Sequence, residues 1–350
     1  MNVQTSLWQR RQAIHASADE MDAADVAALL GVAEATLAAA DPASRRLKPD
    51  WRALLDAAAA LGVLRVVTGN HVATLEQTGC YSGFSVSDDV GLMLNPGGID
   101  LRFFLRHWQS AYAVDGARAA GRLGPSLQFF DAYGDAVHKL YLLDADSRVR
   151  WLGLADTLGW NDPEVVELLP PPAQEEAGVP VDFDRAIFER DWLALDNVHR
   201  FNGLLQRHRL SRRQAFLLAP AGSAERLANE AAVELLQQAR QRRTVIMAFV
   251  CSRGTVQIFT GQISAVEVSA DWLIADNHDA RLRLRRAGIA EIWRVRRPTR
   301  DGSVTSVELL DSRGRTLVTY FGQRREGMPE RTDWRALADG LPMAGSGHDG

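Results

Sequence analysis

One histidine, His199, stands where its ring could serve a metal or a flat ligand. The stretch from Phe188 to Leu210 predicts one amphipathic helix, because apolar residues recur at the i, i+4, i+7 spacing that buries a helix face. That apolar stripe consists of Ala194, Val198, Phe201 and Leu205. His199 lies beside the stripe, at the border with solvent, and next to Gly203, which could let a partner approach closely. The alternative is a half-exposed histidine held by a hydrogen bond.

The composition excludes several classes of site and of protein. The two cysteines, Cys80 and Cys251, are far apart and form no CxxC, haem-attachment or zinc motif. A net charge of -4 argues against a generally basic, nucleic-acid-binding surface. Met1 to Glu20 lack the apolar region of a secretory signal, and no run of about 18 apolar residues suggests membrane insertion. We therefore expect a cytoplasmic protein.

The elements that position His199 belong to a chain of alternating helical and strand-rich regions. Helices are predicted over residues 1–20, 23–30, 32–38 and 51–61. Short alternating segments separated by turn residues predict strands at 64–68, 71–75, 91–94 and 127–131, as in an antiparallel sheet. The angled helix pairs at 23–38 and 199–218 could also be DNA-reading motifs, but the first is alanine-rich and the arginines of the second fit a solvated face.

The second half of the chain repeats the first. Ser126 and the strand–turn–strand pattern after it match Ser306 and its successors, 180 positions later. Trp108 is matched with Trp293, Thr78-Gly79 with Thr260-Gly261, and Leu54-Leu55 with Leu235-Leu236. Four matches in one order indicate a duplicated unit of helices and a sheet. The sequence thus predicts an α+β fold of two tandem repeats, each with helices packed on a large antiparallel β-sheet. The boundaries are 1–165 for the N-terminal repeat, 166–182 for a Pro-rich linker, 183–340 for the C-terminal repeat and 341–350 for a flexible tail.

Several motifs resemble those of the HemS/ChuS/PhuS family of cytoplasmic haem-handling proteins. They run in the family's order from about residue 20 to 335: Arg46-Leu47-Lys48, Leu94-Asn95-Pro96, Asp100 to Leu105, Trp108, Gln128 to Asp131, His138-Lys139, Val198-His199, Gln257 to Gly261, Pro298 to Gly302 and Gly322 to Gly327. The resemblance implies a haem cleft between the halves. It implies His199 as the iron ligand and Arg102 as the distal polar group, which would also be the catalytic group in an enzyme. Phe104 would line the pocket beside Arg102, Phe321 would also contact the haem, and Arg297 and Arg324 would approach the propionates.

The chemistry of these residue types agrees with the roles that the resemblance implies. Neutral imidazole is a common haem ligand, and without attachment cysteines the haem would be a noncovalent haem b. Arginine always carries a charge and can hydrogen-bond an iron-bound water or a propionate. If Asp100 to Arg106 is extended, Arg102 and Phe104 share one face and Phe103 takes the other. A solvated arginine is the alternative for Arg297 and Arg324, and core packing is the alternative for Phe104.

The sequence departs from the family at three positions. Phe321 stands where relatives have Tyr, although Tyr320 next to it could compensate. Asn202 replaces a Phe of at least one relative, and Leu75 replaces a His of some, which weakens the case for a second site in the N-terminal half.

Two functions follow from the resemblance. The first is a haem-binding protein of a bacterial haem-uptake system, which carries or stores imported haem and supports iron acquisition. Its expected partners are haem, an inner-membrane haem importer and a haem oxygenase. The alternative is an enzyme that opens the haem ring, as a haem oxygenase does, and releases iron.

Overall fold

The structure is a computed structural model that describes residues 3–17, 21–95, 97–115, 124–144, 146–160, 167–170, 178–324 and 327–345. The chain forms two compact units. Unit 1 comprises Met1–His71, Leu75–Pro172 and Cys251–Gln257, and unit 2 comprises Val72–Thr74, Ala173–Val250 and Ile258–Gly350. Each half of the chain therefore lends a short segment to the unit built mainly by the other half.

The helices and strands follow one another in the same order in both halves, apart from the 3-10 helix η2 in the second half. The first half contains α1 Val3–Ser17, α2 Ala23–Leu30, α3 Glu34–Ala40, β1 Ser44–Leu47, α4 Trp51–Ala59, β2 Val63–Gly69, β3 Ala73–Cys80, β4 Phe84–Ser87, β5 Val90–Met93, β6 Asp100–Phe104, the 3-10 helix η1 Leu105–His107, β7 Ser110–Val114, β8 Ser126–Phe130, β9 Ala136–Leu142 and α5 Asp146–Thr157. The second half contains α6 Arg185–Leu193, η2 Val198–Arg200, α7 Phe201–His208, α8 Arg212–Leu217, β10 Ala224–Leu227, α9 Ala231–Gln241, β11 Ile246–Cys251, β12 Thr255–Gly261, β13 Ala265–Val268, β14 Trp272–Asp276, β15 Ala280–Arg285, η3 Arg286–Gly288, β16 Glu291–Thr299, β17 Gly302–Leu310, β18 Thr316–Gly322 and α10 Thr332–Asp339.

Strand order confirms the predicted tandem repeat. The first half builds the order β1-β7-β8-β9-β2-β3, and the second half builds β10-β16-β17-β18-β11-β12. Each half of the chain also contains a three-stranded meander, with the order β6-β5-β4 in the first half and β15-β14-β13 in the second. The pairs whose register is resolved are antiparallel, for example β8 with β9 and β17 with β18. The α+β prediction with large antiparallel sheets is therefore confirmed.

The register of the strands corrects one detail of the repeat. Trp293 lies inside β16, directly opposite Glu308 of β17. The residue opposite Gln128, at the matching place in the first half, is Tyr112 of β7. Trp108 precedes β7 and caps η1 instead. Matching Trp108 with Trp293 was therefore wrong, since it aligned two tryptophans on residue type without the strand register.

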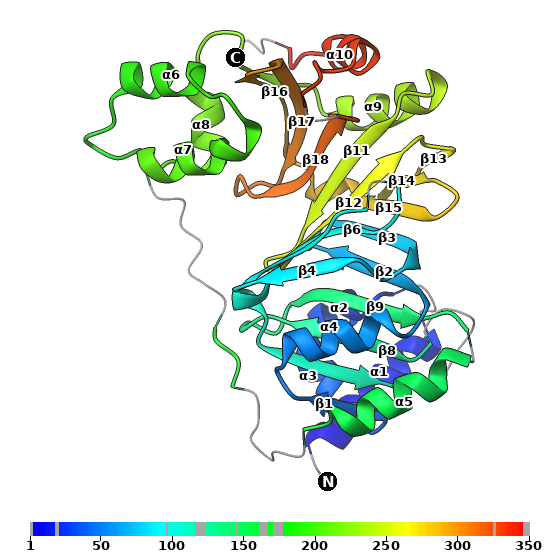
Figure 1. Ribbon diagram of the computed structural model, residues 1–350. Coiled ribbons are helices and arrows are strands. Elements are labelled where there is room, and N and C mark those ends of the chain that lie inside the picture. The colour runs from blue at the N-terminus through cyan, green and yellow to red at the C-terminus, as the bar shows by residue number, and fades with distance from the viewer. Residues whose placement is uncertain are drawn as a thin grey trace. The chain divides into compact units, whose positions relative to one another are not determined.

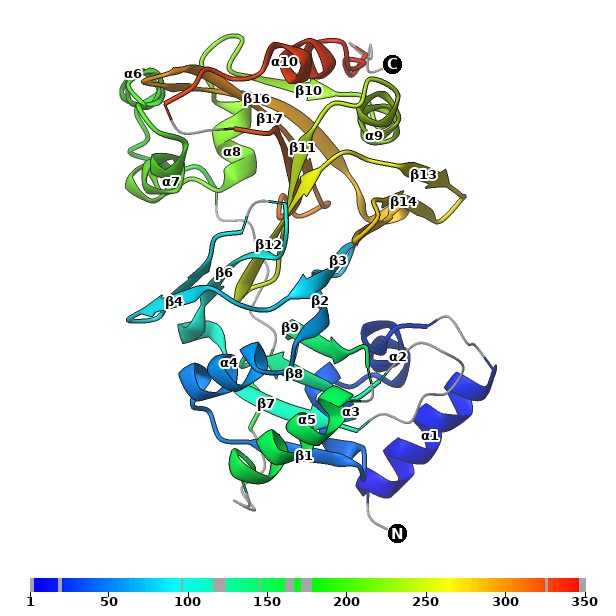
Figure 2. The same ribbon diagram turned by 45° about the vertical axis from the view of Figure 1, so that its right-hand side comes forward.

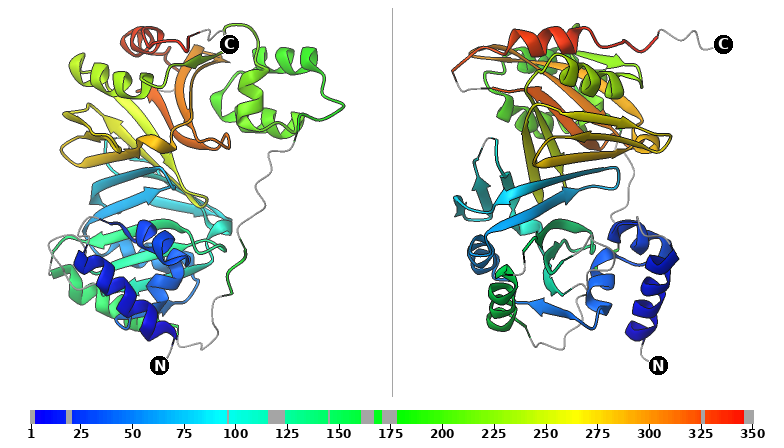
Figure 3. Two further views of the ribbon diagram at one scale, coloured as in Figure 1. Left: turned by 180° about the vertical axis from the view of Figure 1, so that it is seen from behind. Right: turned by 90° about the vertical axis from the view of Figure 1, so that its right-hand side faces the viewer.

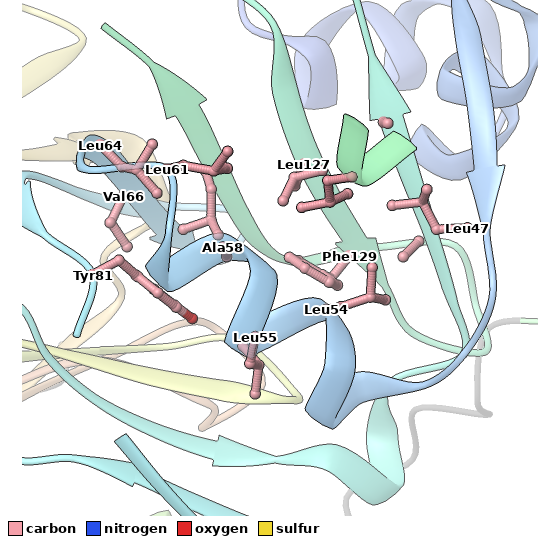
Figure 4. Close-up of a cluster of buried hydrophobic side chains, with 14 of the residues drawn as sticks. Leu47, Leu54, Leu55, Ala58, Leu61, Leu64, Val66, Tyr81, Leu127 and Phe129 are labelled. Atoms are coloured by element: carbon pink, nitrogen blue, oxygen red, sulfur yellow. The ribbon is translucent and has the colours of Figure 1, made fainter. Parts of the chain in front are cut away.

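In unit 1 the strands β7, β8 and β9 are covered by helices on both faces. Leu54 and Leu55 of α4 and Trp151 of α5 belong to one core cluster with Leu127 and Phe129 of β8. Figure 4 shows α4 lying across the strands, with Leu54 on the side of the helix that faces Phe129. On the other face, Ala35 and Ala38 of α3 pack against Tyr112, Val114 and Phe130. The right-hand view of Figure 3 shows α1–α3 in dark blue on one side of these strands and α4 and α5 on the other.

Unit 2 repeats this layering with its own helices. Helices α6, α7 and α8 form a compact group beside β16 and β17 (Figure 1). Their apolar side chains, among them Trp192, Phe201 and Phe216, share a core cluster with Trp293 and Val295 of β16. Helices α9 and α10 lie on the opposite side of these strands (Figure 2), where Trp334 of α10 donates its indole hydrogen to the carbonyl of Thr305.

The predicted single helix from Phe188 to Leu210 is wrong. Helix α6 ends at Leu193, and a bend through Ala194–Asn197 precedes η2 and α7. The break moves the apolar face, so that the buried residues are Phe188, Trp192, Leu195, Phe201, Leu204 and Leu210. Ala194 is exposed and Val198 is half-buried, so neither belongs to the buried stripe.

Some residues of the predicted linker and of the predicted tail make contacts with the folded units. Residues 166 and 171–177 of the predicted linker lie outside the described ranges. Of the described part, Leu169 donates its amide hydrogen to the carbonyl of Ala132 in unit 1. The ordered chain also continues past the predicted boundary at 340, since Leu341 is buried and Ala344 donates to the carbonyl of Arg226. Residues 346–350 of the expected tail lie outside the described residues.

Among the residues that the structure describes, no single helix is long and apolar enough to cross a membrane. The pair α2 and α3 meets that criterion only when the two are taken together, across a bend of 96°.

Candidate functional site

His199 is held at the start of a helix by a local cap. Asn197 has an extended backbone, and its side-chain oxygen accepts a hydrogen bond from the His199 amide at 2.9 Å. This satisfies one of the unpaired donors at the beginning of η2, which runs directly into α7. The sequence Asn-Val-His therefore turns the chain sharply before the helix, and this explains why the segment is not one continuous helix.

The His199 side chain is exposed and open to a ligand. Within the described part of the chain, its ring makes no hydrogen bond and no ion pair. The predicted alternative, a half-exposed histidine held by a hydrogen bond, is therefore wrong for the ring, because the bond to the Asn197 side chain comes from the His199 backbone amide. The described residues also contain no cluster of three or more His, Cys, Asp or Glu side chains that could hold a metal ion. A metal ion bound by His199 would therefore take most of its other ligands from a bound molecule.

The loop before His199 is fastened to strand β16. The indole nitrogen of Trp192 donates to the carbonyl of Arg296 at 3.3 Å. The guanidinium of Arg300, just after β16, contacts the carboxylate of Asp196 at 3.0 Å. The Arg300 amide also donates to the Asp196 carbonyl. These contacts fix the bend between α6 and η2 and thereby the direction in which His199 leaves the backbone.

An aromatic layer lies beneath the start of α7. The Phe201 ring is edge-on to Trp192, with centroids 5.0 Å apart, and stacked with Phe216 at 6.3 Å. All three rings are buried. Burial of such rings is the main source of rigidity in a small helical layer, so the helix that begins beside His199 rests on a fixed base.

Arg297 lies inside this layer. Its side chain is only 2% exposed, and its Nη2 donates to the carboxylate of Glu308 while its Nη1 donates to the Ser306 hydroxyl at 2.8 Å. The guanidinium carbon lies 4.1 Å from the centre of the Phe201 ring. The predicted alternative, a solvated surface arginine, is wrong, because Arg297 is a buried partner of Glu308. The expected contact of Arg297 with haem stays a prediction.

Glu308 is a fully buried carboxylate between two arginines. Arg212 of α8 donates its Nε to Glu308 at 2.6 Å, and Arg297 contacts the other carboxylate oxygen. Burial alone would raise the pKa of Glu308, but the positive charges of Arg212 and Arg297 outweigh burial and lower it to about 2. The carboxylate is therefore ionised at neutral pH and fixes both guanidinium groups.

Phe321 and Tyr320 point to opposite faces of β18. Phe321 is half-buried, packs edge-on against Phe249 at 5.3 Å, and pairs across the sheet with Ser306. Tyr320 is completely buried, and its hydroxyl has no hydrogen-bond partner among the described residues. Because neighbouring strand residues face opposite ways, Tyr320 cannot compensate for the hydroxyl that Phe321 lacks, and that expectation is wrong.

Arg324 lies just after β18 and is half-buried. Its Nε is buried without a hydrogen-bond partner within the described residues. An unpaired buried donor costs free energy unless a ligand or water satisfies it. The predicted contact between Arg324 and a propionate stays a prediction, with a donor that a carboxylate could satisfy.

Arg102 and Phe104 belong to unit 1 and share a face of β6, as predicted. The burial pattern alternates along the strand: Leu101 and Phe103 are buried, while Arg102 and Phe104 are half-buried. The strand ends at Phe104, whose amide donates to the carbonyl of Gly254 at 2.9 Å. Phe103 packs in the core against Trp108.

Asp100 adds a charge beside Arg102 that the sequence did not single out. An oxygen of Asp100 lies 3.6 Å from the Arg102 Nη1, and neither atom has a hydrogen-bond partner among the described residues. Burial raises the pKa of the Asp100 carboxyl, although Arg102 opposes this rise. The Asp100 carboxylate restrains the Arg102 guanidinium, whose Nη1 has no hydrogen-bond partner among the described residues.

The structure thus groups the candidates by unit. In unit 2 it brings Arg297 and Phe321 to one face of β16–β18, beneath the helix that His199 precedes. In unit 1 it brings Arg102 together with Phe104. Sequence reasoning missed Glu308 and Arg212. A glutamate in an otherwise apolar strand segment, Ser306 to Leu310, was the available signal.

The comparisons with known proteins agree across the whole chain. Residues 30–158 and 209–341 match the family described as "Haemin-degrading HemS.ChuX domain". Arg102 lies in the first matched segment and Arg297, Phe321 and Arg324 in the second, whereas His199 lies between them. The hemin transport protein HemS of Yersinia enterocolitica is 40% identical over 316 residues, which cover 89% of this chain and 90% of that protein.

Two solved structures share the fold over nearly their full length. The heme-binding protein PhuS of Pseudomonas aeruginosa, in its holo form, has a TM-score of 0.90 and 37% identity and covers 98% of this chain and 100% of its own. The heme-degrading enzyme ChuS of Escherichia coli O157:H7 has a TM-score of 0.89 and 33% identity and covers 97% of this chain and 99% of its own.

Proposed function

The chain belongs to the haemin-degrading HemS/ChuX-domain family, and from this premise we propose that it binds haem as cargo in bacterial haem utilisation. A relative named for hemin transport and a similar solved structure titled as heme-binding support this function. In this proposal the protein works in the cytoplasm, takes haem from an inner-membrane importer and passes it to a haem oxygenase. The observation that carries it furthest is the exposed, unpaired ring of His199.

His199 fits the role of iron ligand on the evidence of unit 2 alone. Its ring is exposed and without a partner among the described residues, whereas the backbone beneath it is fixed by Asn197 and Asp196. An imidazole held in place in this way can serve as a ligand of noncovalent haem. With the porphyrin occupying the equatorial positions of iron, a lone histidine is sufficient on the protein side.

Arg102 fits the role of the second haem-facing group. Its Nη1 is buried without a hydrogen-bond partner in the described residues, and Asp100 restrains the guanidinium without satisfying it. An arginine cannot ligate iron, but it can hydrogen-bond a water on the metal or a carboxylate. Phe104, on the same face of β6, would supply an apolar surface for the porphyrin. Phe321 and Arg324 of unit 2 are proposed as further haem contacts.

A spectroscopic titration tests the ligand. Haem is added to the wild-type apoprotein and to His199→Ala, and the Soret band and affinity are followed. We expect the mutant to lose the wild-type Soret position and to bind at least about tenfold more weakly, because a metal–ligand bond is removed. His278→Ala is the matched control, since the His278 side chain is 94% exposed and lies on a hairpin turn. An unchanged Soret band in His199→Ala would remove His199 from the site.

The second candidate function is haem degradation. It is supported by the similar structure titled as a heme-degrading enzyme and by the free donor of Arg102, which could stabilise negative charge that develops above the iron. The haem itself supplies most of the oxygen chemistry when it is bound. The protein's own part would be to orient the porphyrin and to hold a hydrogen-bond donor, the Arg102 guanidinium, beside it.

A product assay separates the two functions. The haem-loaded protein is supplied with a reductant and oxygen in the presence of catalase. An enzyme gives a defined open-chain tetrapyrrole, releases iron and turns over, and Arg102→Ala slows these steps. Loss of product when catalase is added would assign the reaction to stray peroxide and favour the carrier.

A further inference from the structure

The turn between β16 and β17 carries a cation that contacts the loop before His199. The turn runs from Pro298 to Gly302, and the proposed haem contacts include none of its residues. Arg300 lies in the middle of this turn, and its side chain is 78% exposed. Its guanidinium nevertheless contacts Asp196, which lies more than a hundred positions earlier in the chain. The turn therefore holds a segment that the sequence places far away.

Arg300 binds both the main chain and the side chain of Asp196. The Arg300 amide donates to the Asp196 carbonyl at 3.1 Å, and the Nη2 of Arg300 donates to a carboxylate oxygen of Asp196 at 3.0 Å. Asp196 directly precedes Asn197, whose side chain accepts the hydrogen bond from the His199 amide. The direction in which His199 leaves the backbone thus depends on an ion pair three residues before it.

This ion pair is accessible to solvent, in contrast to the base on which α7 rests. The Asp196 side chain is 27% exposed, and its second carboxylate oxygen lies 3.3 Å from Nη1 of Arg200 without a hydrogen bond among the described residues. Trp192 and Phe201, which form the base, are buried. Exposed ion pairs are weak and are screened by salt. The bend before His199 can therefore loosen while the packing beneath α7 stays intact.

We propose that the contact between Arg300 and Asp196 is a latch that sets how long haem stays bound to His199. The inference rests on the proposed function and concerns the regulation of that site. Arg300 and Asp196 are positioning residues, because they act through the Asn197 cap and the His199 backbone. An anion that pairs with Arg300, such as a carboxylate on the surface of a recipient protein, competes with Asp196. Such competition opens the latch and speeds the release of haem.

The rate at which haem leaves the loaded protein tests the latch. The haem-loaded protein is mixed with an excess of apomyoglobin, which captures released haem, and the Soret band is followed with time. Arg300→Ala is expected to raise the rate about threefold, in line with the small contribution of an exposed ion pair. Arg300→Lys retains the charge, so its increase is expected to be smaller. In the His199→Ala background, Arg300→Ala is expected to change nothing, because the latch acts only through that histidine.

Competing anions give a second readout. Raising sodium chloride to about 0.5 M is expected to increase the wild-type rate by a similar factor, because salt screens the ion pair. Poly-L-glutamate at low salt presents carboxylates and is expected to have the same effect. In Arg300→Ala neither addition is expected to change the rate by more than about 1.5-fold, since the screened contact is already absent. Equal acceleration of the wild type and of Arg300→Ala would overturn the proposal.

Arg185→Ala is the matched control. Arg185 pairs with Glu189 at 2.8 Å on α6, and its side chain is 61% exposed. Removing this pair is expected to change the release rate by less than about 1.5-fold, because it does not hold the bend before His199. An equal effect of Arg185→Ala, or an undiminished effect of Arg300→Ala in the His199→Ala background, would overturn the latch. A wild-type protein that takes up no haem would reject the proposed function itself.

Discussion

Arg297 lies with its guanidinium carbon 4.1 Å from the centre of the ring of Phe201, the first residue of the helix α7 that follows His199. This contact links strand β16 to α7 through a cation and an aromatic face, and Glu308 completes it from β17. The sheet therefore supports the predicted ligand helix with a charged layer as well as with apolar packing. The stability of that layer determines how firmly His199 is positioned.

Removing the charge of Glu308 is expected to destabilise unit 2. In Glu308→Gln, the buried Arg297 and the partly exposed Arg212 lose the one carboxylate that pairs with them among the described residues. Breaking a buried pair on one side costs about 3–5 kcal/mol. Urea unfolding of the apoprotein at pH 7 measures the change. Glu225→Gln is the control, because Glu225 also pairs with two arginines, Arg294 and Arg296, but is 28% exposed. Its cost is expected to be about 1 kcal/mol or less, and equal costs in both variants would contradict the assignment.

The stability of the protein is expected to fall on mild acidification because of His138. Its ring is enclosed by Tyr81, Phe103, Trp108 and Phe129, and Thr68 is its close hydrogen-bond partner at 2.9 Å. Burial lowers the pKa of His138 from 6.5 to about 3. Below pH 6.5 the unfolded chain takes up a proton that the folded chain refuses. Stability is thus complete above pH 6.5 and declines toward pH 3 by about 1.4 kcal/mol per pH unit.

Urea unfolding curves measured between pH 6.5 and 4.5 separate the contribution of His138 to the free energy of unfolding from that of Glu308. The ordinary pKa of that glutamate is 4.5 and its folded pKa about 2, so its contribution is lost only below pH 4.5. His138→Phe fills the aromatic enclosure without a titrating group, and the slope in this window is expected to fall by about one proton. A slope that is the same in wild type and His138→Phe would show that other groups cause it.

Gly203→Ala tests whether a ligand approaches the α7 backbone closely. A methyl group added at Gly203 meets no atom within 4 Å, so apoprotein stability is expected to rise by about 1 kcal/mol, the helix-propensity difference. Haem affinity is expected to fall, because Gly203 is one turn from His199 on the same face. Gln206→Ala on the same helix is the control. If Gly203→Ala leaves affinity intact, the glycine has no role in approach.

Gly254→Ala is expected to disturb the support of β6. An added methyl would lie 2.7 Å from Cδ1 of Trp108. The Gly254 carbonyl accepts hydrogen bonds from the Trp108 indole at 3.0 Å and from the Phe104 amide at 2.9 Å. Overpacking of this kind costs about 1–3 kcal/mol. Tryptophan fluorescence and urea unfolding measure it, and Gly153→Ala, which meets no atom within 4 Å, is the comparison that should cause no loss.

The repeat and the alternation along strands could be predicted because they depend on local pattern. Strand β6 shows the faces expected for Arg102 and Phe103, since side chains alternate wherever the backbone is extended. The break before His199 could not be predicted from helical periodicity. It depends on Asp196, which is held by Arg300, a residue more than a hundred positions away.

The predicted surroundings of the arginines on α8 were wrong. Arg212 and Arg213 were expected on a solvated face, yet each pairs with a carboxylate buried on the sheet, Glu308 and Glu291 respectively. Sequence shows that an arginine is present, but not which carboxylate the fold brings to it. Both partners lie on strands far along the chain, so only the folded sheet reveals the pairing.

The short segment Cys251–Gln257 belongs to unit 1 although it is encoded in the second half. A chain cut at the linker would leave Trp108 without its acceptor, the carbonyl of Gly254. An N-terminal half produced alone would therefore lack part of its own unit, and only the C-terminal half, which carries Gly254, could restore that acceptor.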